Sequence, residues 1–275
     1  MIHTSTQLKA LVRNQSHGDN AKAMTLIRNF GMERFLERMS LSKYNGNLIL
    51  KGGLLIASMV SLDNRATMDI DTTIRNYNLS AEEAGKMIED IIAVPLDDGT
   101  RFTVKSVENI MDEAEYTGIR FKLEAALDNM KTPLKIDIST DDVITPKEVN
   151  YEYKLMFEKR SIPLLAYNLE TVLAEKMETI ISRGTLNTRM RDYYDLMILN
   201  VVKSDAIDYA DLAKALEATS KKRNSYELLS APKHILEQIK FDVDCRNKIG
   251  DIKYVDRKPY QLLSDSCSKI NFPVS

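Results

Sequence analysis

Hydrophobic residues recur at helical spacing through most of the first fifty positions. Apolar side chains fall every three or four residues in 5–14 and again in 19–40, which predicts two helices. The pattern changes at 47–51, a short apolar run typical of a strand, and this run ends in Gly52 and Gly53. The sequence therefore predicts a helical start followed by a strand and a glycine turn.

The next hundred residues mix strand and helix patterns. A capping-box sequence, Ser80 to Glu83, opens a predicted helix over 80–93. Strict alternation in 119–124 and 134–139 predicts half-buried antiparallel strands. Two further strands are expected over 65–74 and 101–107.

The rest of the chain is predominantly helical. The stretch 145–163 has no clear period, and from Asn168 onward the pattern is helical almost to the end. We therefore expect an α+β fold with a mixed sheet over residues 1–150 and an α-helical domain over 151–275.

Charge and composition exclude several classes of protein. The 275 residues contain 38 Lys and Arg against 40 Asp and Glu, so a uniformly basic nucleic-acid-coating protein is excluded, although a local basic patch is not. No apolar run reaches about 18 residues, and no secretory signal opens the chain. Cys245 and Cys267 lack metal-ligand spacing and are expected to be free thiols in a reducing compartment, so we expect a cytoplasmic protein without membrane association.

The double glycine and the segment after it carry the first candidate chemistry. A strand that ends in Gly52 and Gly53 and continues into an apolar helix exposes backbone N–H groups at a helix N-terminus, which favours phosphate. The simpler alternative is an ordinary turn. Downstream, Asp69 and Asp71 leave the same face of a predicted strand. The two carboxylates would repel each other, and a magnesium ion between them would relieve that repulsion.

Other residues extend this face. Arg65 and Thr67 precede the two aspartates at the same period, and Asp137 leaves the polar face of the strand 134–139. If the two strands are neighbours, Asp137 could complete a three-carboxylate site. A pair of aspartates on a strand is more often a solvated face. The order glycine turn, apolar helix, aspartate strand and second aspartate strand favours a metal–nucleotide site.

A lysine interrupts an otherwise apolar helix face in the C-terminal half. Lys176 falls on the stripe of the helix predicted over 169–183, and Gly184 precedes the next helix, predicted over 188–202. Lys176 and Asp192 are equally far from that turn and so lie at similar heights in an antiparallel pair. Alternatively, Lys176 extends to solvent, and Asp192 is a solvated acid beside Arg189. Similarly, Arg191 and Asp195 could form a surface ion pair.

Four motifs together resemble one family. They are Gly52-Gly53, Arg65-x-Thr67-x-Asp69-x-Asp71, Glu175-Lys176, and the segment from Arg189 to Leu196. Their order and spacing resemble the AbiEii nucleotidyltransferase-like toxins, the toxin halves of type IV abortive-infection toxin–antitoxin pairs, which are related to the mycobacterial MenT toxins. The resemblance is strongest over 48–200. The sequence departs from the simplest members of the superfamily at Leu54, where serine or threonine is common.

The resemblance implies a fold and a chemistry. The fold would be a polymerase-β-like nucleotidyltransferase core with a helical C-terminal lobe. The substrate would be an NTP, GTP favoured, with Mg²⁺, and tRNA is the acceptor in relatives. By resemblance, Asp69 and Asp71 would hold the metal, with Asp137 as the third carboxylate of the wider superfamily. Residues of the nucleotide site would be Gly52, Gly53, Ser58, Arg65, Thr67, Lys176 and Arg189. Asp192 would be the last catalytic acid.

Three functions remain open from the sequence. The first is transfer of a nucleotide to RNA, in which the metal and Lys176 would offset developing charge. Asp137 or Asp192 would orient or deprotonate the acceptor hydroxyl. The second is an NTP-binding protein that inhibits growth by occupying RNA or a partner without turnover, and the third is modification of protein hydroxyls. A local basic surface could track RNA, and its residues would be Arg183, Arg189, Arg191 and Lys221–Arg223. A basic run such as Lys221–Arg223 is more often a solvated helix end. A type IV antitoxin encoded nearby would act without binding the toxin.

Overall fold

The computed structural model describes residues 1–61, 65–75, 80–111, 117–140, 142–230, 234–235 and 237–238. The chain divides into two compact units, one formed by 1–142 and 149–166, the other by 143–148 and the chain from 167 onward. Cys245 and Cys267 lie outside the described residues.

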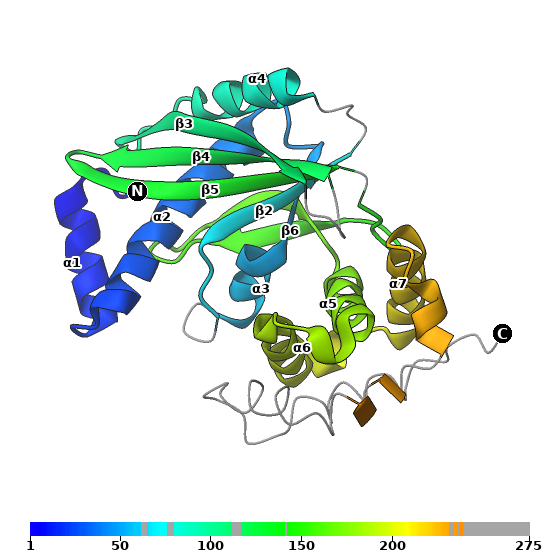
Figure 1. The fold of residues 1–275 in the computed structure, drawn as a ribbon. Coiled ribbons are helices and arrows are strands. Elements are labelled where there is room, and N and C mark those ends of the chain that lie inside the picture. The colour runs from blue at the N-terminus through cyan, green and yellow to red at the C-terminus, as the bar shows by residue number, and fades with distance from the viewer. Residues whose placement is uncertain are drawn as a thin grey trace. The chain divides into compact units, whose positions relative to one another are not determined.

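The first unit is a seven-stranded mixed sheet with four helices, and Figure 1 shows its arrangement. The strands run in the order β3-β4-β5-β2-β1-β7-β6. Strand β2 pairs parallel with β5, and β1 pairs parallel with β7, while the other neighbours are antiparallel. The elements are α1 Ser5–Ser16, α2 Asn20–Leu41, β1 Leu48–Lys51, α3 Gly52–Val60, β2 Asp69–Ile74, α4 Ala81–Ile92, β3 Thr100–Met111, β4 Thr117–Leu127, β5 Met130–Thr140, β6 Val149–Lys154 and β7 Ser161–Ala166.

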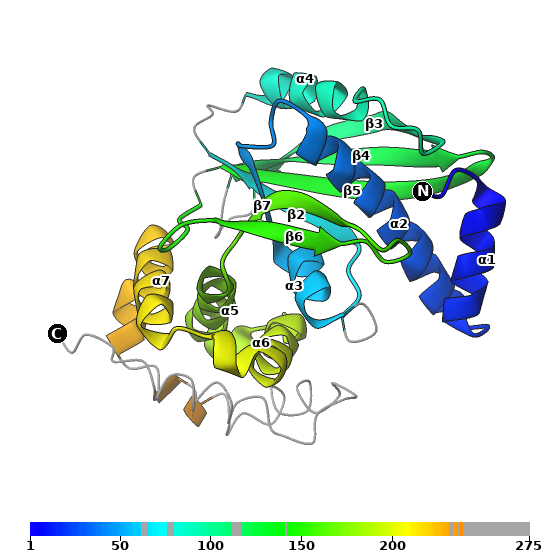
Figure 2. The same ribbon diagram turned by 180° about the vertical axis from the view of Figure 1, so that it is seen from behind.

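Helix α2 covers one face of this sheet, which Figure 2 shows from the side on which α2 lies in front. Gly31 permits the close approach, because a Cβ there would already be 3.4 Å from Leu134 and 3.5 Å from Ala125. The alternating partners of Leu134 on β5, namely Ile136 and Ile138, are buried with it. Residues 135 and 137 therefore leave the opposite face of the sheet, which α2 does not cover.

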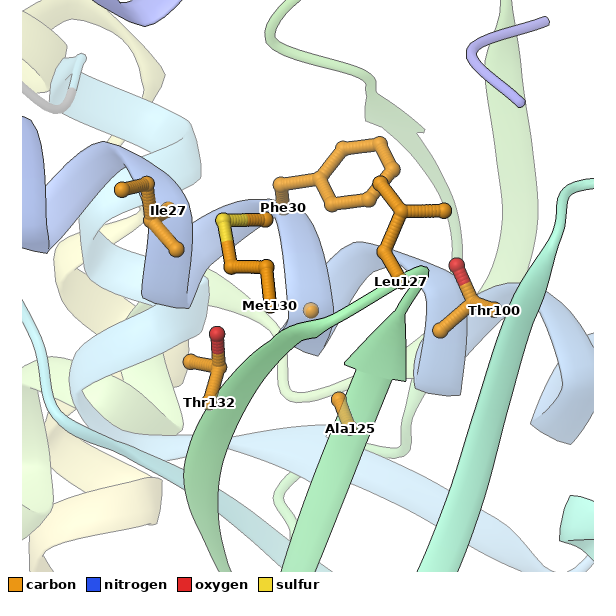
Figure 3. A pocket seen from close by; sticks show the side chains of 8 residues that line it. Ile27, Phe30, Thr100, Ala125, Leu127, Met130 and Thr132 are labelled. Atoms are coloured by element: carbon orange, nitrogen blue, oxygen red, sulfur yellow. The ribbon is translucent and has the colours of Figure 1, made fainter. Parts of the chain in front are cut away.

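A small pocket lies between α2 and the sheet, and Figure 3 shows its lining. The side chains around it are apolar or carry a hydroxyl, and none is charged. They belong to Ile27, Phe30, Thr100, Ala125, Leu127, Met130 and Thr132. This pocket is a packing gap of the α2 core and lacks the polar groups that a nucleotide requires.

The second unit is helical. Its elements are α5 Leu169–Arg183, η1 Gly184–Leu186, α6 Met190–Lys203, η2 Ser204–Ala206, α7 Tyr209–Lys222 and η3 Tyr226–Ser230. The Asn168 side chain caps α5 by accepting from the backbone N–H of Thr171 at 2.7 Å, and Gly184 ends it with φ +51°. Helix α5 packs against both α6 and α7.

The predicted fold class is confirmed. Helix α3 begins at Gly52, α5 ends at Gly184, and the capping box at Ser80 opens α4, all as expected. The region 145–163 differs from its prediction, because it contains β6 and the start of β7. Strand β7 pairs with β1, so 149–166 lies with the sheet of the first unit, beyond the boundary expected at residue 150. Within the part of the chain that the structure describes, no helix is long and apolar enough to cross a bilayer.

Candidate functional site

Four charged residues form a row across neighbouring strands of the first unit. Lys51 on β1 is the register partner of Asp71 on β2, which is the partner of Asp137 on β5. Asp137 in turn is the partner of Arg120 on β4. Register partners share one face of a sheet. The row therefore runs cation, carboxylate, carboxylate, cation across the face opposite α2.

The double glycine allows Asp71 to approach the start of α3. Gly52 has φ +67°, and a Cβ there would lie 2.1 Å from Asp71 Oδ2. The backbone N–H of Gly53 donates to the same oxygen at 3.3 Å. A Cβ on Gly53 would lie 2.7 Å from Thr67 Oγ1. Both glycines are thus required by close contacts with the aspartate strand, and the N-terminus of α3 faces a carboxylate.

Burial and neighbouring charges determine the electrostatics of Asp71. Burial raises the pKa of Asp71, and the neighbouring carboxylates of Asp137 and Asp69 raise it further. The Lys51 ammonium and the hydrogen bond from Gly53 oppose this rise without cancelling it. The ionised form of Asp71 is therefore unfavourable in the folded protein, and a divalent ion beside it would stabilise that form.

Two basic side chains contact the other two carboxylates. Arg120 donates to both oxygens of Asp137, at 2.9 and 2.8 Å. Lys135 Nζ lies 2.7 Å from Asp69 Oδ2 and 3.9 Å from Asp137 Oδ2. Among the described residues, no three His, Cys, Asp or Glu side chains are arranged to hold a metal together. The expected set of three carboxylates is therefore not assembled, and Asp137 as a metal ligand stays a prediction.

Lys51 and its partner Asp142 were not among the predicted site residues. Lys51 is buried, and its Nζ lies 2.5 Å from Asp142 Oδ2, which also accepts from Ser139 Oγ at 2.7 Å. Lys51 and Asp142 are 91 residues apart in the sequence, so no local sequence pattern predicts this pair. For Lys135 and Arg120 a signal existed, because both occupy the polar positions of strictly alternating strands.

The remaining predicted residues of this region lie at different places. Arg65 and Thr67 are buried beside the start of α3, and Arg65 donates to the carbonyl of Ala66. Ser58 is five residues into α3 from Gly53, about 7.5 Å along the helix axis. Its hydroxyl donates to the carbonyl of Leu55 at 2.7 Å and is 2.9 Å from the Tyr151 hydroxyl. Thr67 and Arg65 thus adjoin the glycines, whereas Ser58 contacts a different strand.

In the second unit, Lys176 and Asp192 meet as their equal distance from Gly184 predicts. Lys176 Nζ is 2.6 Å from Asp192 Oδ1 and 3.4 Å from Asp195 Oδ2, while Arg189 Nε is 3.4 Å from Asp192 Oδ2. Burial lowers the pKa of Lys176, but the two aspartates more than offset that effect and the pKa is raised. Lys176 is therefore a charged lysine held by two carboxylates.

The structure decides against two alternatives that the sequence left open in this unit. Asp195 is fully buried against Lys176, so a pair at the surface with Arg191 does not describe it, because the packing of α6 on α5 turns Asp195 inward. Arg223 ends the predicted basic run Lys221–Arg223, but its guanidinium is 2.7 Å from Glu178 and 3.1 Å from Glu175. Arg223, which follows α7, forms ion pairs with two glutamates of α5 and is not part of an open phosphate-binding surface.

Comparison with known families decides the classification. A model of the nucleotidyl transferase AbiEii toxin family of type IV toxin–antitoxin systems matches residues 34–258. The chain belongs to the AbiEii family. This match includes every strand of the first unit and the helices α5, α6 and α7.

Solved structures support the same fold for this AbiEii family member. A Helicobacter pylori protein described as a candidate nucleotidyltransferase is 16% identical, with a TM-score of 0.50 over 89% of this chain and 93% of its own. JHP933 from Helicobacter pylori is 17% identical, with a TM-score of 0.50 over 89% and 90%. At these identities the likeness concerns the fold. No curated protein matches the chain.

Proposed function

We propose that this AbiEii family member is a magnesium-dependent nucleotidyltransferase that transfers the nucleotide of an NTP, with GTP favoured, to an RNA acceptor such as tRNA. One observation carries the proposal. The strand that bears Asp69 and Asp71 lies directly against the N-terminus of α3, with Asp71 in contact with Gly53. This arrangement supports a metal held by the carboxylate pair next to a phosphate at the helix N-terminus.

The donor set fits magnesium. Magnesium is typically bound through one or two carboxylates together with substrate phosphates and water, so it does not require three protein ligands. Asp69 and Asp71 supply two carboxylates on one face, and the pKa of Asp71 is raised first by burial and then by Asp137 and Asp69. When bound, the ion would offset charge that develops on the phosphates during transfer.

The chain itself would bind and orient the triphosphate. The start of α3 presents backbone N–H groups and the positive end of the helix dipole. The absence of a side chain at Gly52 and Gly53 lets Asp71 and Thr67 approach this backbone closely, so the carboxylate proposed to hold the metal lies beside these N–H groups. Arg65 adds a buried cation next to Gly53, with its Nη2 3.2 Å from the position of a Cβ there.

In the proposed reaction, the acceptor hydroxyl oxygen attacks the α-phosphorus, and the bond to pyrophosphate breaks. The hydroxyl proton passes to a base. Asp137 and Asp192 are the two candidate bases, and each is held by basic side chains, Arg120 and Lys135 in one case and Lys176 and Arg189 in the other. These contacts fix the orientation of each carboxylate, and either could orient the acceptor hydroxyl or accept its proton.

The biological role follows from the acceptor. A nucleotide added to tRNA would stop translation, which would arrest the host cell during phage infection. A type IV antitoxin would counter this effect without binding the toxin, so we propose no interface for it. Two alternatives remain, occupancy without turnover and modification of protein hydroxyls. They differ from this role because a labelled nucleotide would stay untransferred in the first case and accumulate on protein in the second.

The experiment incubates purified protein with each α-labelled NTP, magnesium and total tRNA. Asp69→Asn protein and a sample with EDTA serve as controls. We expect label in tRNA with the intact protein and metal, and strongest with GTP. Label on protein would favour modification of hydroxyl side chains. Saturable NTP binding without label transfer would favour occupancy. The absence of both NTP binding and label transfer would contradict the proposal.

A further inference from the structure

Lys135 occupies the place of a counter-cation inside the proposed metal site. Its ammonium lies 2.7 Å from Asp69 Oδ2 and 3.9 Å from Asp137 Oδ2. It reaches both from β5, where residue 135 is the register partner of Asp69 and residue 137 that of Asp71. The side chain is 29% exposed, so the ammonium can leave toward water without unfolding the strand.

The lysine and a metal ion compete for the same oxygen. Magnesium binds carboxylate oxygens at about 2.0–2.1 Å. An ion on Asp69 Oδ2 and the ammonium at its observed position would lie within about 5 Å of each other, where like charges repel. Lys135 must therefore leave Asp69 before that oxygen can ligate magnesium.

We propose that Lys135 makes metal binding depend on the nucleotide, by holding Asp69 and Asp137 until the negative charge of a triphosphate draws the ammonium away. The inference rests on the proposed function, because it assigns Asp69 to the metal. It adds a regulating residue to that site. Arg120 holds Asp137 from the other side with two hydrogen bonds, so release of Lys135 does not leave Asp137 without a cation.

The neighbouring strand supplies a matched control. Lys122 on β4 is the register partner of Lys135 and leaves the same face of the sheet, but its ammonium pairs with Glu108. Lys122→Gln removes the same charge at the same height. This substitution changes the electrostatic potential at this face of the sheet without altering the contacts of Asp69.

The experiment measures Mn²⁺ binding to nucleotide-free protein by electron paramagnetic resonance. Lys135→Gln should bind Mn²⁺ on the order of fivefold more tightly than wild type, as expected for loss of a partly exposed ion pair. Lys122→Gln and Lys135→Arg should remain within about twofold of wild type. A gain in affinity requires folded protein, so misfolding cannot imitate it.

Two outcomes would overturn the inference, and they are distinguishable. Equal Mn²⁺ affinity of Lys135→Gln and wild type, with binding lost in Asp69→Asn, would overturn the role of Lys135 and leave the proposed metal site intact. Mn²⁺ binding that does not change in Asp69→Asn would overturn the metal site itself, and with it this inference.

Discussion

Asp71 and Asp137 are register partners on the parallel strands β2 and β5, and their carboxylates share the face of the sheet opposite α2. Lys51 and Arg120 stand at the two ends of the same row. Two carboxylates side by side are unfavourable unless cations surround them. The row therefore places two carboxylates between two cations at the start of α3. The proposed role of Asp71 in catalysis is opposed by the free-energy cost of ionising a buried carboxyl there.

Replacing Asp71 by asparagine tests that opposition. Burial and the neighbouring carboxylates raise the pKa of Asp71, so its ionisation at neutral pH costs folding free energy. Asp71→Asn should keep or increase the free energy of unfolding at pH 7, by up to about 1 kcal/mol, while transfer falls at least about 100-fold. Urea unfolding and the labelling assay measure the two quantities. The control Asp97→Asn removes a fully exposed carboxylate and should change neither.

The glycine at position 52 is predicted to be essential to the site. Gly52→Ala would place a Cβ 2.1 Å from Asp71 Oδ2 at a residue with φ +67°. We expect a loss of about 1–3 kcal/mol in stability together with loss of activity. Gly85 is the matched control, because it lies within α4 and an added Cβ meets nothing within 4 Å. Gly85→Ala should stabilise the protein by about 0.5–1 kcal/mol, and an equal response of the two variants in thermal melts would refute this account of Gly52.

Much of this local geometry was predictable from the sequence, because short-range signals specify it. The cap at Ser80, the stop at Gly184 and the pairing of Lys176 with Asp192 depend on residues close along the chain. The strands β6 and β7 were missed, because β7 finds its partner β1 more than a hundred residues earlier. The Lys51–Asp142 contact was missed for the same reason. The burial of Asp195 could not be predicted, because helix rotation is set by packing against α5, which the sequence pattern of α6 alone does not specify.

Lys176 should be important for the stability of the second unit. Its removal in Lys176→Ala leaves Asp192 and Asp195 buried without their shared cation. We expect a loss of about 3 kcal/mol, as for other broken buried pairs. Lys214→Ala breaks an exposed pair with Asp211 and should cost less than about 1 kcal/mol. Similar chemical-denaturation midpoints for the two variants would contradict this role.

A buried carboxyl on α2 predicts a pH-dependent stability. Burial raises the pKa of Glu33 from 4.5 to about 8, although its carboxylate accepts from the backbone N–H of Met156 at 2.9 Å and from Asn29 at 3.0 Å. The folded state thus binds a proton that the unfolded state releases above about pH 4.5. Its contribution to stability is complete below pH 4.5 and is lost as pH rises toward 8, by about 1.4 kcal/mol per unit.

Glu33→Gln tests this assignment. Glutamine keeps an acceptor oxygen and cannot ionise, so the variant should lose less stability than wild type between pH 5 and about pH 8. Glu82→Gln changes an exposed carboxylate at the start of α4 and should retain the wild-type dependence. Parallel urea titrations at four pH values measure the difference. Identical pH slopes for Glu33→Gln and wild type would show that Glu33 is ionised in the folded protein.

The proposed chemistry is tested most directly by comparing NTP labelled at the α-phosphate with NTP labelled at the γ-phosphate. Wild-type protein, magnesium and tRNA would be incubated with each, and Asp71→Asn would be run in parallel. The account predicts that α-label enters the acceptor, that γ-label leaves in pyrophosphate, and that Asp71→Asn transfers neither. Transfer of the γ-label to the acceptor, or equal α-label transfer by Asp71→Asn, would contradict it.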